Sequence, residues 1–150
     1  MTNLSLNTEG IDYGACTFEL NDKKIQHRVA KITPTKVGQF VTIWKRNQQG
    51  ITEPYHVTDA LDFIFITTIE NEKIGQFIFP KSVLAENAII SSDQKEGKRG
   101  IRVYPPWGEV TSKQALKTQS WQTKYFVTIR ENKIDNATLL TQLIPKIGQE

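Results

Sequence analysis

The alternation of apolar and polar positions along the chain predicts a protein rich in β-structure. Residues 27–32 and 39–46 are rich in β-branched and aromatic side chains, and the turn-forming residues 33–38 between them predict a hairpin. Residues 61–69 are apolar at successive positions, so both faces of that strand are expected to be buried. Residues 74–80 follow a polar turn and are expected to return beside it. The pattern therefore predicts two β-hairpins.

Helices are predicted where a side chain that can cap a helix precedes a run of helix-compatible residues. Their expected spans are residues 83–88, 113–121 and 136–144, capped by Ser82, by Thr111 or Ser112, and by Asp135. Strands are expected over residues 100–104 and 124–129, whereas residues 11–20 fit a helix or a strand equally well. These elements predict one α+β domain over residues 1–150, with a mixed, mainly antiparallel sheet of five or six strands flanked by two to four helices.

Length and composition agree with a single folded domain. A chain of 150 residues is long enough for one hydrophobic core, and seven Phe, four Tyr and three Trp residues supply large packing groups. No segment approaches the run of about 20 apolar residues that a transmembrane helix needs, and the first residues lack the pattern of a secretion signal. The single cysteine, Cys16, cannot form an internal disulfide. We therefore expect a cytoplasmic protein that does not insert into membranes.

Charge is distributed in blocks along the chain. The net charge is only +3, but residues 23–50 hold seven basic and no acidic side chains, and residues 94–133 hold nine basic and three acidic ones. Residues 51–93 between them are mainly acidic. The two basic blocks can fold together into one positive surface that faces an anion. Alternatively, basic and acidic segments interleave in space and neutralise each other.

Arginine and lysine residues from both basic blocks are the candidate anion-binding residues. Arg offers a planar fork that suits phosphate or carboxylate, and Lys offers a compact point charge. The alternative is a solvated basic edge that only discourages strand pairing between molecules. The candidates are Arg28, Lys31, Lys36, Lys45 and Arg46 from the first hairpin, and Lys98, Arg99 and Arg102 from the second block.

Aromatic and amide side chains follow the second basic block and form a candidate wall of the same site. Flat rings can stack on bases or on guanidinium groups, and Gln can bond a base edge, although both residue types also serve in cores and on helix surfaces. Trp107 follows Pro105 and Pro106, so it is the best candidate for an exposed ring. The complete wall comprises Tyr104, Trp107, Gln119, Trp121 and Gln122.

Five long segments of the sequence resemble the MepB-like family. They are residues 13–20, 28–46, 75–84, 96–107 and 114–126. The resemblance implies a bacterial protein. The family is named for a member associated with a multidrug-efflux operon, and the biochemical activity of the family is not established. It also implies a fold similar to that of restriction-endonuclease-like domains.

Restriction-endonuclease-like domains include metal-dependent nucleases, so the sequence is compared with the residues that such an enzyme needs. Such an enzyme needs two acids at the ends of adjacent strands to hold magnesium, and a lysine one residue beyond the second acid. Asp62, or Asp59, can be the first acid, and Lys81 stands where the lysine is needed. Phe79, however, replaces the second acid, and the other acid-x-Lys triplet, residues 96–98, lies in an expected loop. Catalysis by Asp62 and Lys81 is therefore the alternative reading.

We expect a protein that binds a phosphate-rich or other anionic ligand, with nucleic acid as the first candidate and a nucleotide or another small anion as the second. Two other classes stay open, namely a metal-dependent nuclease and a protein-interaction module associated with multidrug efflux. The sequence favours binding over catalysis. No metal site or cofactor is expected, apart from magnesium if the nuclease alternative holds.

Overall fold

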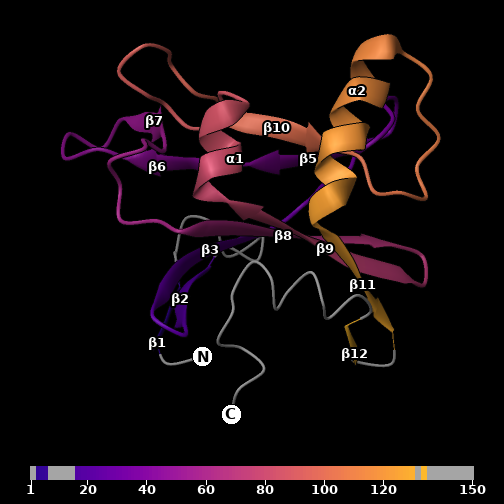
Figure 1. The fold of residues 1–150 in the computed structure, drawn as a ribbon, viewed down its shortest axis with the longest axis horizontal. Coiled ribbons are helices and arrows are strands. Elements are labelled where there is room, and N and C mark those ends of the chain that lie inside the picture. The colour runs from indigo at the N-terminus through magenta and orange to yellow at the C-terminus, as the bar shows by residue number, and fades with distance from the viewer. Residues whose placement is uncertain (1–2, 7–15, 131–132, 135–150) are drawn as a thin grey trace.

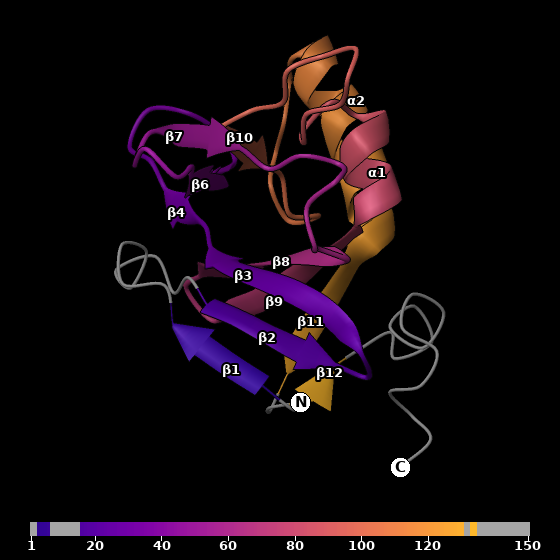
Figure 2. The same ribbon diagram turned by 90° about the vertical axis from the view of Figure 1, so that its left-hand side faces the viewer.

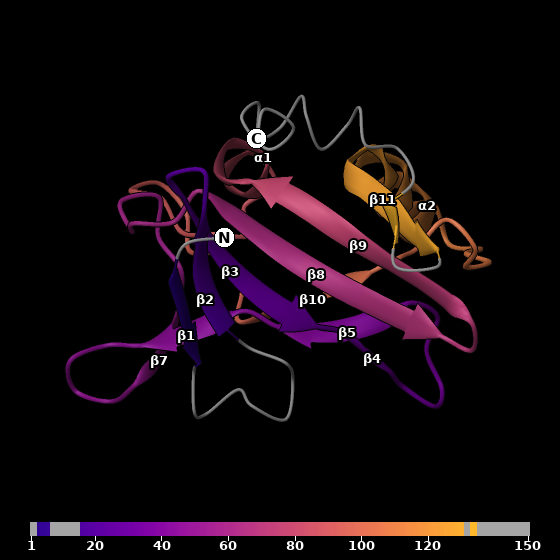
Figure 3. The same cartoon turned by 90° about the horizontal axis from the view of Figure 1, so that it is seen from below.

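The computed structural model describes residues 3–6, 16–130 and 133–134. A large twisted sheet forms the base of the molecule, and two small sheets and two helices cover one of its faces (Figures 1 and 2). Figure 3 views the large sheet from its opposite face. In order across the sheet, its strands are β1 (Asn3–Leu6), β2 (Cys16–Leu20), β3 (Lys23–Val29), β8 (Phe63–Glu70), β9 (Lys73–Pro80), β11 (Phe126–Arg130) and β12 (Lys133–Ile134).

The large sheet is mixed and mainly antiparallel, as the sequence predicts. Strands β3 and β8 pair in parallel, and the other pairings described within this sheet are antiparallel. Strands β2, β3, β8, β9 and β11 form its centre, and the short strands β1 and β12 extend its two edges. The five central strands agree with the expected five or six, and the two edge strands extend the described sheet to seven. Residues 16–20, which fitted helix or strand from sequence, form a strand.

The first predicted hairpin is present in a small sheet apart from the large sheet, but residues 27–29 of its expected first strand belong to β3 of the large sheet. A three-stranded sheet has the order β10 (Gly100–Val103), β5 (Gln39–Thr42) and β4 (Lys31–Ile32), and β6 (Trp44–Arg46) pairs with β7 (Thr52–Pro54). The two strands expected over residues 27–32 and 39–46 are thus each divided, at Ala30 and at Ile43. Both residues are buried. At Ala30 the chain leaves the large sheet for the three-stranded sheet, and at Ile43 it passes from that sheet to the two-stranded one.

Two helices stand over the large sheet, namely α1 (Lys81–Glu86) and α2 (Lys113–Gln122), and a short 3-10 helix, η2 (Thr123–Tyr125), follows α2. Ser112 caps α2, because its Oγ accepts a hydrogen bond from the Ala115 amide at 3.1 Å. Ser82 does not cap α1. The helix begins at Lys81, directly after strand β9 ends at Pro80, so Ser82 lies inside the helix and no side chain caps its first amides. The helix expected over residues 136–144 lies outside the described residues.

The hydrophobic core has two parts because β8 and β9 are buried on both faces. Ile64, Ile66, Phe77 and Phe79 belong to one cluster with residues of the small sheets and helix α1, whereas Phe63, Phe65 and Ile78 belong to a second cluster formed within the large sheet. The prediction of a central strand over residues 61–69 is therefore confirmed. Across the described residues, no helix has the length and hydropathy required to cross a membrane.

Candidate anion-binding site

A depression in the described part of the molecule is lined by strand β10, helix α2 and the loop after α1. Figure 1 shows β10 between α1 and α2. The depression has a volume of about 920 Å³ and is named here the basic hollow. Four segments contribute to it: the β4–β5 hairpin, the loop after α1, strand β10 and helix α2. Its lining residues are Lys36, Phe40, Asn87, Ile89, Lys95, Lys98, Gly100, Ile101, Arg102, Tyr104, Ser112, Gln114, Ala115, Lys117, Thr118, Trp121 and Gln122.

The described residues that line the basic hollow carry charge of only one sign. Its lining includes four lysines and Arg102, and no Asp or Glu is found among the described residues that line it. Lys36, Lys95, Lys98 and Lys117 are exposed, and within residues 16–130 their ammonium groups have no ion pair. Cations without matching carboxylates create a positive potential that attracts anions.

The Arg102 guanidinium is hydrogen-bonded, but among the described residues it forms no ion pair. The group donates to the carbonyls of Val37 and Gly38, at 3.3 and 3.4 Å, and to Thr33 Oγ1 at 2.8 Å. All three partners are neutral, so these bonds fix the side chain without cancelling its charge. Arg102 thereby ties the β4–β5 turn, which carries Lys36, to the rim of the hollow.

Gln122 joins helix α2 to strand β10 beneath the hollow. Its Oε1 accepts a hydrogen bond from the Tyr104 amide at 2.8 Å, and its Nε2 donates to the Arg102 carbonyl at 3.0 Å. Strand β10 is at the end of its small sheet, so this amide satisfies backbone groups on an edge that no neighbouring strand covers. Gln122 is only 1% exposed and both polar atoms of its amide are bonded to the backbone, so it stabilises the site and does not offer its amide to a ligand.

The loop after α1 is folded back on itself and brings two lysines to the rim. The Lys98 amide donates to the Ile89 carbonyl at 2.8 Å, and the Gly97 amide donates to Ser91 Oγ at 2.8 Å. A side chain at Gly97 would clash with backbone atoms, since its Cβ would lie 2.5 Å from the Ile89 carbonyl oxygen. Glycine is therefore required for the turn that places Lys95 and Lys98.

Six of the residues predicted from sequence come together at the basic hollow, namely Lys36, Lys98, Arg102, Tyr104, Trp121 and Gln122. Sequence reasoning missed Phe40, Lys95 and Lys117. The two lysines lie in the second basic block, but only the folded loop and the packing of α2 identify them as neighbours. The signal for Phe40 was its alternation with the buried residues Gln39 and Val41, which places its ring on the outer face of β5.

Arg28 requires a correction. It was expected on the anion-binding surface, but it is 4% exposed and lies in the interior. Its guanidinium donates to Gln26 Oε1 at 3.2 Å, to the His27 carbonyl at 2.9 Å and to Tyr55 Oη at 3.1 Å. The side chain is buried because Tyr55, distant in sequence, folds over it.

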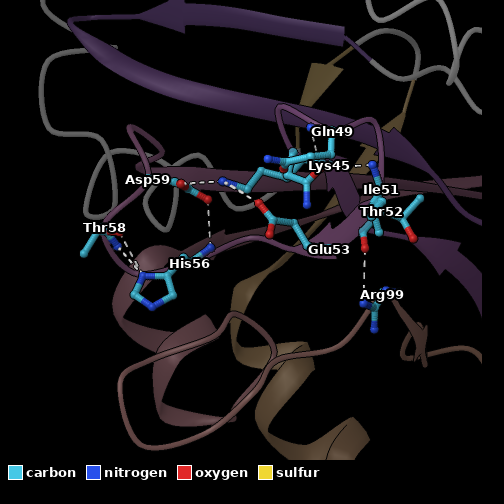
Figure 4. Close-up of polar contacts among 10 residues, drawn as sticks. Lys45, Gln49, Ile51, Thr52, Glu53, His56, Thr58, Asp59 and Arg99 are labelled. Atoms are coloured by element: carbon cyan, nitrogen blue, oxygen red, sulfur yellow. Dashed lines mark hydrogen bonds and ion pairs between the residues drawn. The ribbon is translucent and has the colours of Figure 1, made fainter.

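Other predicted cations lie at a second depression, shown in Figure 4 and named here the paired-charge cleft. Lys45 Nζ is 2.6 Å from Asp59 Oδ1 and 3.6 Å from Glu53 Oε1. Asp59 Oδ2 also accepts a hydrogen bond from the His56 amide at 2.8 Å. The cleft has a volume of about 480 Å³ and is lined by Lys45, Asn47, Ile51, Thr52, Glu53, Pro54, His56, Thr58, Asp59, Ser91, Glu96 and Arg99.

Arg99 and Arg46 also lie outside the basic hollow. Arg99 donates to the Thr52 carbonyl at 3.2 Å and approaches Glu96 Oε1 at 3.5 Å. Arg46 donates to the Gly50 carbonyl at 2.7 Å, and its guanidinium carbon lies 5.2 Å from the centre of the Trp44 ring. Lys31 is exposed on β4 and does not line the hollow either. The eight predicted cations therefore do not form one surface.

The ion pair in the paired-charge cleft shifts the pKa values of both partners. The hydrogen bond to Asp59 raises the pKa of Lys45, against the opposing effect of burial. Burial acts to raise the pKa of Asp59, but the hydrogen bonds from Lys45 and from the His56 amide, together with the charge of Lys45, outweigh it and hold that pKa below its ordinary value. Both groups are therefore charged across a wide range of pH.

Trp107 and Gln119 stabilise the loop before α2. The Trp107 ring packs edge-on against Phe126 at 5.5 Å between ring centres, and its Nε1 donates to Glu70 Oε1 at 3.2 Å. Gln119 Nε2 donates to the carbonyls of Pro105 and Gly108, at 3.0 and 3.1 Å. Trp107 is thus partly buried, in contrast to the expectation of an open ring, because the loop folds down onto the large sheet.

The nuclease alternative can be tested on the geometry of its candidate residues. The strand ends do meet, since the Lys81 amide donates to the Asp62 carbonyl at 2.9 Å. However, Lys81 Nζ donates to the Asp59 carbonyl at 2.7 Å, and Asp62 Oδ2 accepts from the Lys24 amide at 2.8 Å. Phe79, at the position of the second acid, is fully buried. Among the described residues no group of three His, Cys, Asp or Glu side chains could hold a metal ion, so these residues do not fit a magnesium centre.

Comparison with known proteins agrees with the resemblance seen in the sequence. A family model described as MepB-like matches residues 7–128. The fold is similar to a solved structure, the crystal structure of MepB, with a TM-score of 0.82 and 38% sequence identity over 88% of this chain and 87% of that chain. No curated protein matches the chain. On the family match and this likeness, the chain belongs to the MepB-like family.

Proposed function

We propose that the basic hollow binds a phosphate-rich ligand, with nucleic acid as the first candidate and a nucleotide or another small anion as the second. One observation carries this proposal. Five cationic side chains from four separate segments line one depression, and the described lining residues include no carboxylate. Folding therefore concentrates positive charge that the described residues around the hollow do not neutralise.

The chemistry of the lining supports a phosphate ligand. Lysine ammonium groups are the usual point-charge partners of phosphate, and binding a polyanion releases its condensed counterions, which adds to affinity at low salt. Hydroxyl and amide groups of Ser112, Gln114 and Thr118 lie among the cations and can bond phosphate oxygens or sugar hydroxyls. Because the cations come from several segments, they suit a ligand with more than one phosphate.

A catalytic role has less support. The Asp62 carboxylate and the Lys81 ammonium group are hydrogen-bonded within the protein, and the buried ring of Phe79 stands where the second acid would be needed. The expected likeness to restriction-endonuclease-like domains concerns the fold and remains a prediction, and a fold does not determine an activity. We therefore propose binding and no reaction.

The proposal can be tested by measuring the affinity for a fluorescein-labelled oligonucleotide at several salt concentrations. We expect the logarithm of the association constant to fall linearly as the logarithm of salt concentration rises. Replacing Lys95, Lys98 and Lys117 by Gln should reduce this slope by about 2–3, because each lysine contacts about one phosphate.

A control with the same change in net charge isolates the effect of position. Lys23, Lys73 and Lys124 are exposed and do not line the hollow, so replacing these three by Gln should leave most of the binding intact. Equal losses in the two triple variants would show that net charge, and not the hollow, governs binding. Thermal unfolding of both variants checks that the fold is retained.

A further inference from the structure

We infer that the ligand of the basic hollow is a nucleic acid with unpaired bases, and that the Phe40 ring stacks on one of those bases. This inference rests on the proposed function and adds to it the class of nucleic acid and the residue that selects it. Phosphate contacts alone do not distinguish a single strand from a duplex. Stacking on an aromatic ring does distinguish them, because it needs a base whose face is accessible.

Phe40 presents an aromatic ring on the outer face of its sheet. It lies on the middle strand of the three-stranded sheet, and its ring points away from the core that its neighbours Gln39 and Val41 enter. It remains 39% exposed. Tyr104 and Trp121 are the other rings at the hollow, but both are partly buried, and Trp121 packs against Phe79 at 5.4 Å. Phe40 is therefore the ring of this lining with the most free surface.

Charged residues flank this ring on both neighbouring strands. In the register of the sheet, Phe40 is opposite Arg102 on β10 and opposite Lys31 on β4. The Arg102 guanidinium carbon lies 6.0 Å from the ring centre. A base stacked on Phe40 would place its flanking phosphates near cations, and this combination of a ring with basic neighbours on a sheet surface is how many single-strand-binding proteins work.

Gly100 makes room for the ring. A Cβ at Gly100 would lie 2.6 Å from Cζ of Phe40, so any other residue would displace the ring from its place beside β10. The hollow is an open depression of about 920 Å³, a volume within the range of ligand sites, so it has room for one or two nucleotides. A duplex keeps its bases paired inside and can reach only the rim.

The test compares four labelled probes of about 15 units each: oligo-dT, oligo-U, an abasic oligodeoxynucleotide of the same charge, and a DNA duplex. The wild-type chain should bind oligo-dT or oligo-U more tightly than the abasic and duplex probes. Phe40→Leu should weaken binding of the preferred single strand by about 5- to 150-fold and leave the abasic probe unchanged. Phe40→Tyr keeps the ring and should retain affinity.

Ile69 provides the matched control, because it is a similarly exposed apolar residue that does not line the hollow. Ile69→Ala should not change the affinity for any probe. Equal wild-type affinity for oligo-dT, oligo-U and the abasic probe, with no effect of Phe40→Leu, would overturn the stacking inference. The proposed function would still stand in that case if the triple lysine variant lost binding. Failure of the wild type to bind any probe at low salt would reject the proposed function itself. The comparison of probes on wild-type protein does not depend on the folding of a variant.

Discussion

The basic hollow and the paired-charge cleft contain similar side chains in opposite electrostatic states. In the cleft, Lys45 is matched by Asp59 and Glu53, and Arg99 approaches Glu96. In the hollow, four lysines and Arg102 meet no carboxylate among the described lining residues. Both regions draw on the same basic blocks of the sequence. Whether a basic side chain supports the fold or stays available to a ligand therefore depends on whether folding places a carboxylate beside it. The number of basic residues nearby in the sequence does not decide this.

The two regions should therefore respond differently to the same kind of substitution. A partly exposed ion pair contributes about 0–1 kcal/mol to the free energy of unfolding, so changes in the cleft should appear in stability. Solvated lysines contribute little to folding, so changes in the hollow should appear in ligand affinity.

Charge reversal in the hollow should have the largest effect. Lys98→Glu combined with Lys117→Glu replaces two attractive contacts by two repulsive ones, so the affinity for an oligonucleotide at low salt should fall by about 100-fold or more. Fluorescence anisotropy measures this loss. The matched reversal at Lys23 and Lys73, away from the hollow, should cost far less, and an equal loss there would erase the distinction between the hollow and the rest of the surface.

Removing the support of the hollow should act mainly on stability. Gln122→Leu leaves the Tyr104 amide and the Arg102 carbonyl without their partner, so the free energy of unfolding should fall by about 2–4 kcal/mol. Denaturant unfolding measures this change. Gln114 is exposed on the same helix, and Gln114→Leu should change stability by no more than about 0.5 kcal/mol. Similar values for the two variants would contradict the role assigned to Gln122.

The ion pair of the cleft should make stability depend on pH. The pKa of Asp59 is lowered in the folded state, so its carboxylate contributes stability above the ordinary aspartate pKa of about 3.9, and this contribution is lost as pH falls through the folded value. The pKa of Lys45 is raised, so its contribution is lost only as pH rises above about 10.4. Asp59→Asn should therefore reduce stability by about 1 kcal/mol near pH 7 and by progressively less below pH of about 4.

Unfolding of wild type and Asp59→Asn across this pH range measures the difference directly. A difference that stays constant from neutral to acid pH would show that the carboxylate acts through packing and not through its charge. Oligonucleotide binding serves as the control, since the cleft lies outside the proposed site and the affinity at pH 7 should be nearly unchanged.

Lys36 should show the smallest effect and define the edge of the hollow. It lies on the β4–β5 turn and also lines a neighbouring depression that contains Glu70 and Glu109. Lys36→Gln should lower the salt slope of binding by about 0.7–0.9, the value of a single phosphate contact. Lys24→Gln, at an exposed position elsewhere, provides the comparison. An unchanged slope for Lys36→Gln would confine the ligand to the side of the hollow formed by β10 and α2.

Local patterns predicted the parts of the fold that depend on neighbouring residues. The apolar run at residues 61–69 identifies β8, the turn residues 33–38 identify the β4–β5 hairpin, and Ser112 caps α2 as expected. The division of the hairpin strands at Ala30 and Ile43 was not predictable, because it depends on how two sheets pack. The same is true of the extra edge strands.

Site residues were harder to predict because their roles depend on partners distant in sequence. Arg28 carries the same charge as Arg102, but Tyr55 covers the first and leaves it no access to a ligand. Trp107 looked exposed after two prolines, but Glu70 and Phe126 bind it to the large sheet. Conversely, Phe40 resembles an ordinary strand residue until the register places Arg102 beside it.

Chemical-shift mapping tests the central claim most directly. Amide signals of the isotope-labelled chain are followed by nuclear magnetic resonance while an unlabelled oligonucleotide is added at low salt. The charge of the basic hollow predicts that the largest shifts occur at Lys95, at Lys98, in residues 100–102 and in residues 114–118, while the residues around Lys45 and Asp59 change little. Shifts centred on the paired-charge cleft, or spread evenly over all exposed lysines, would contradict it.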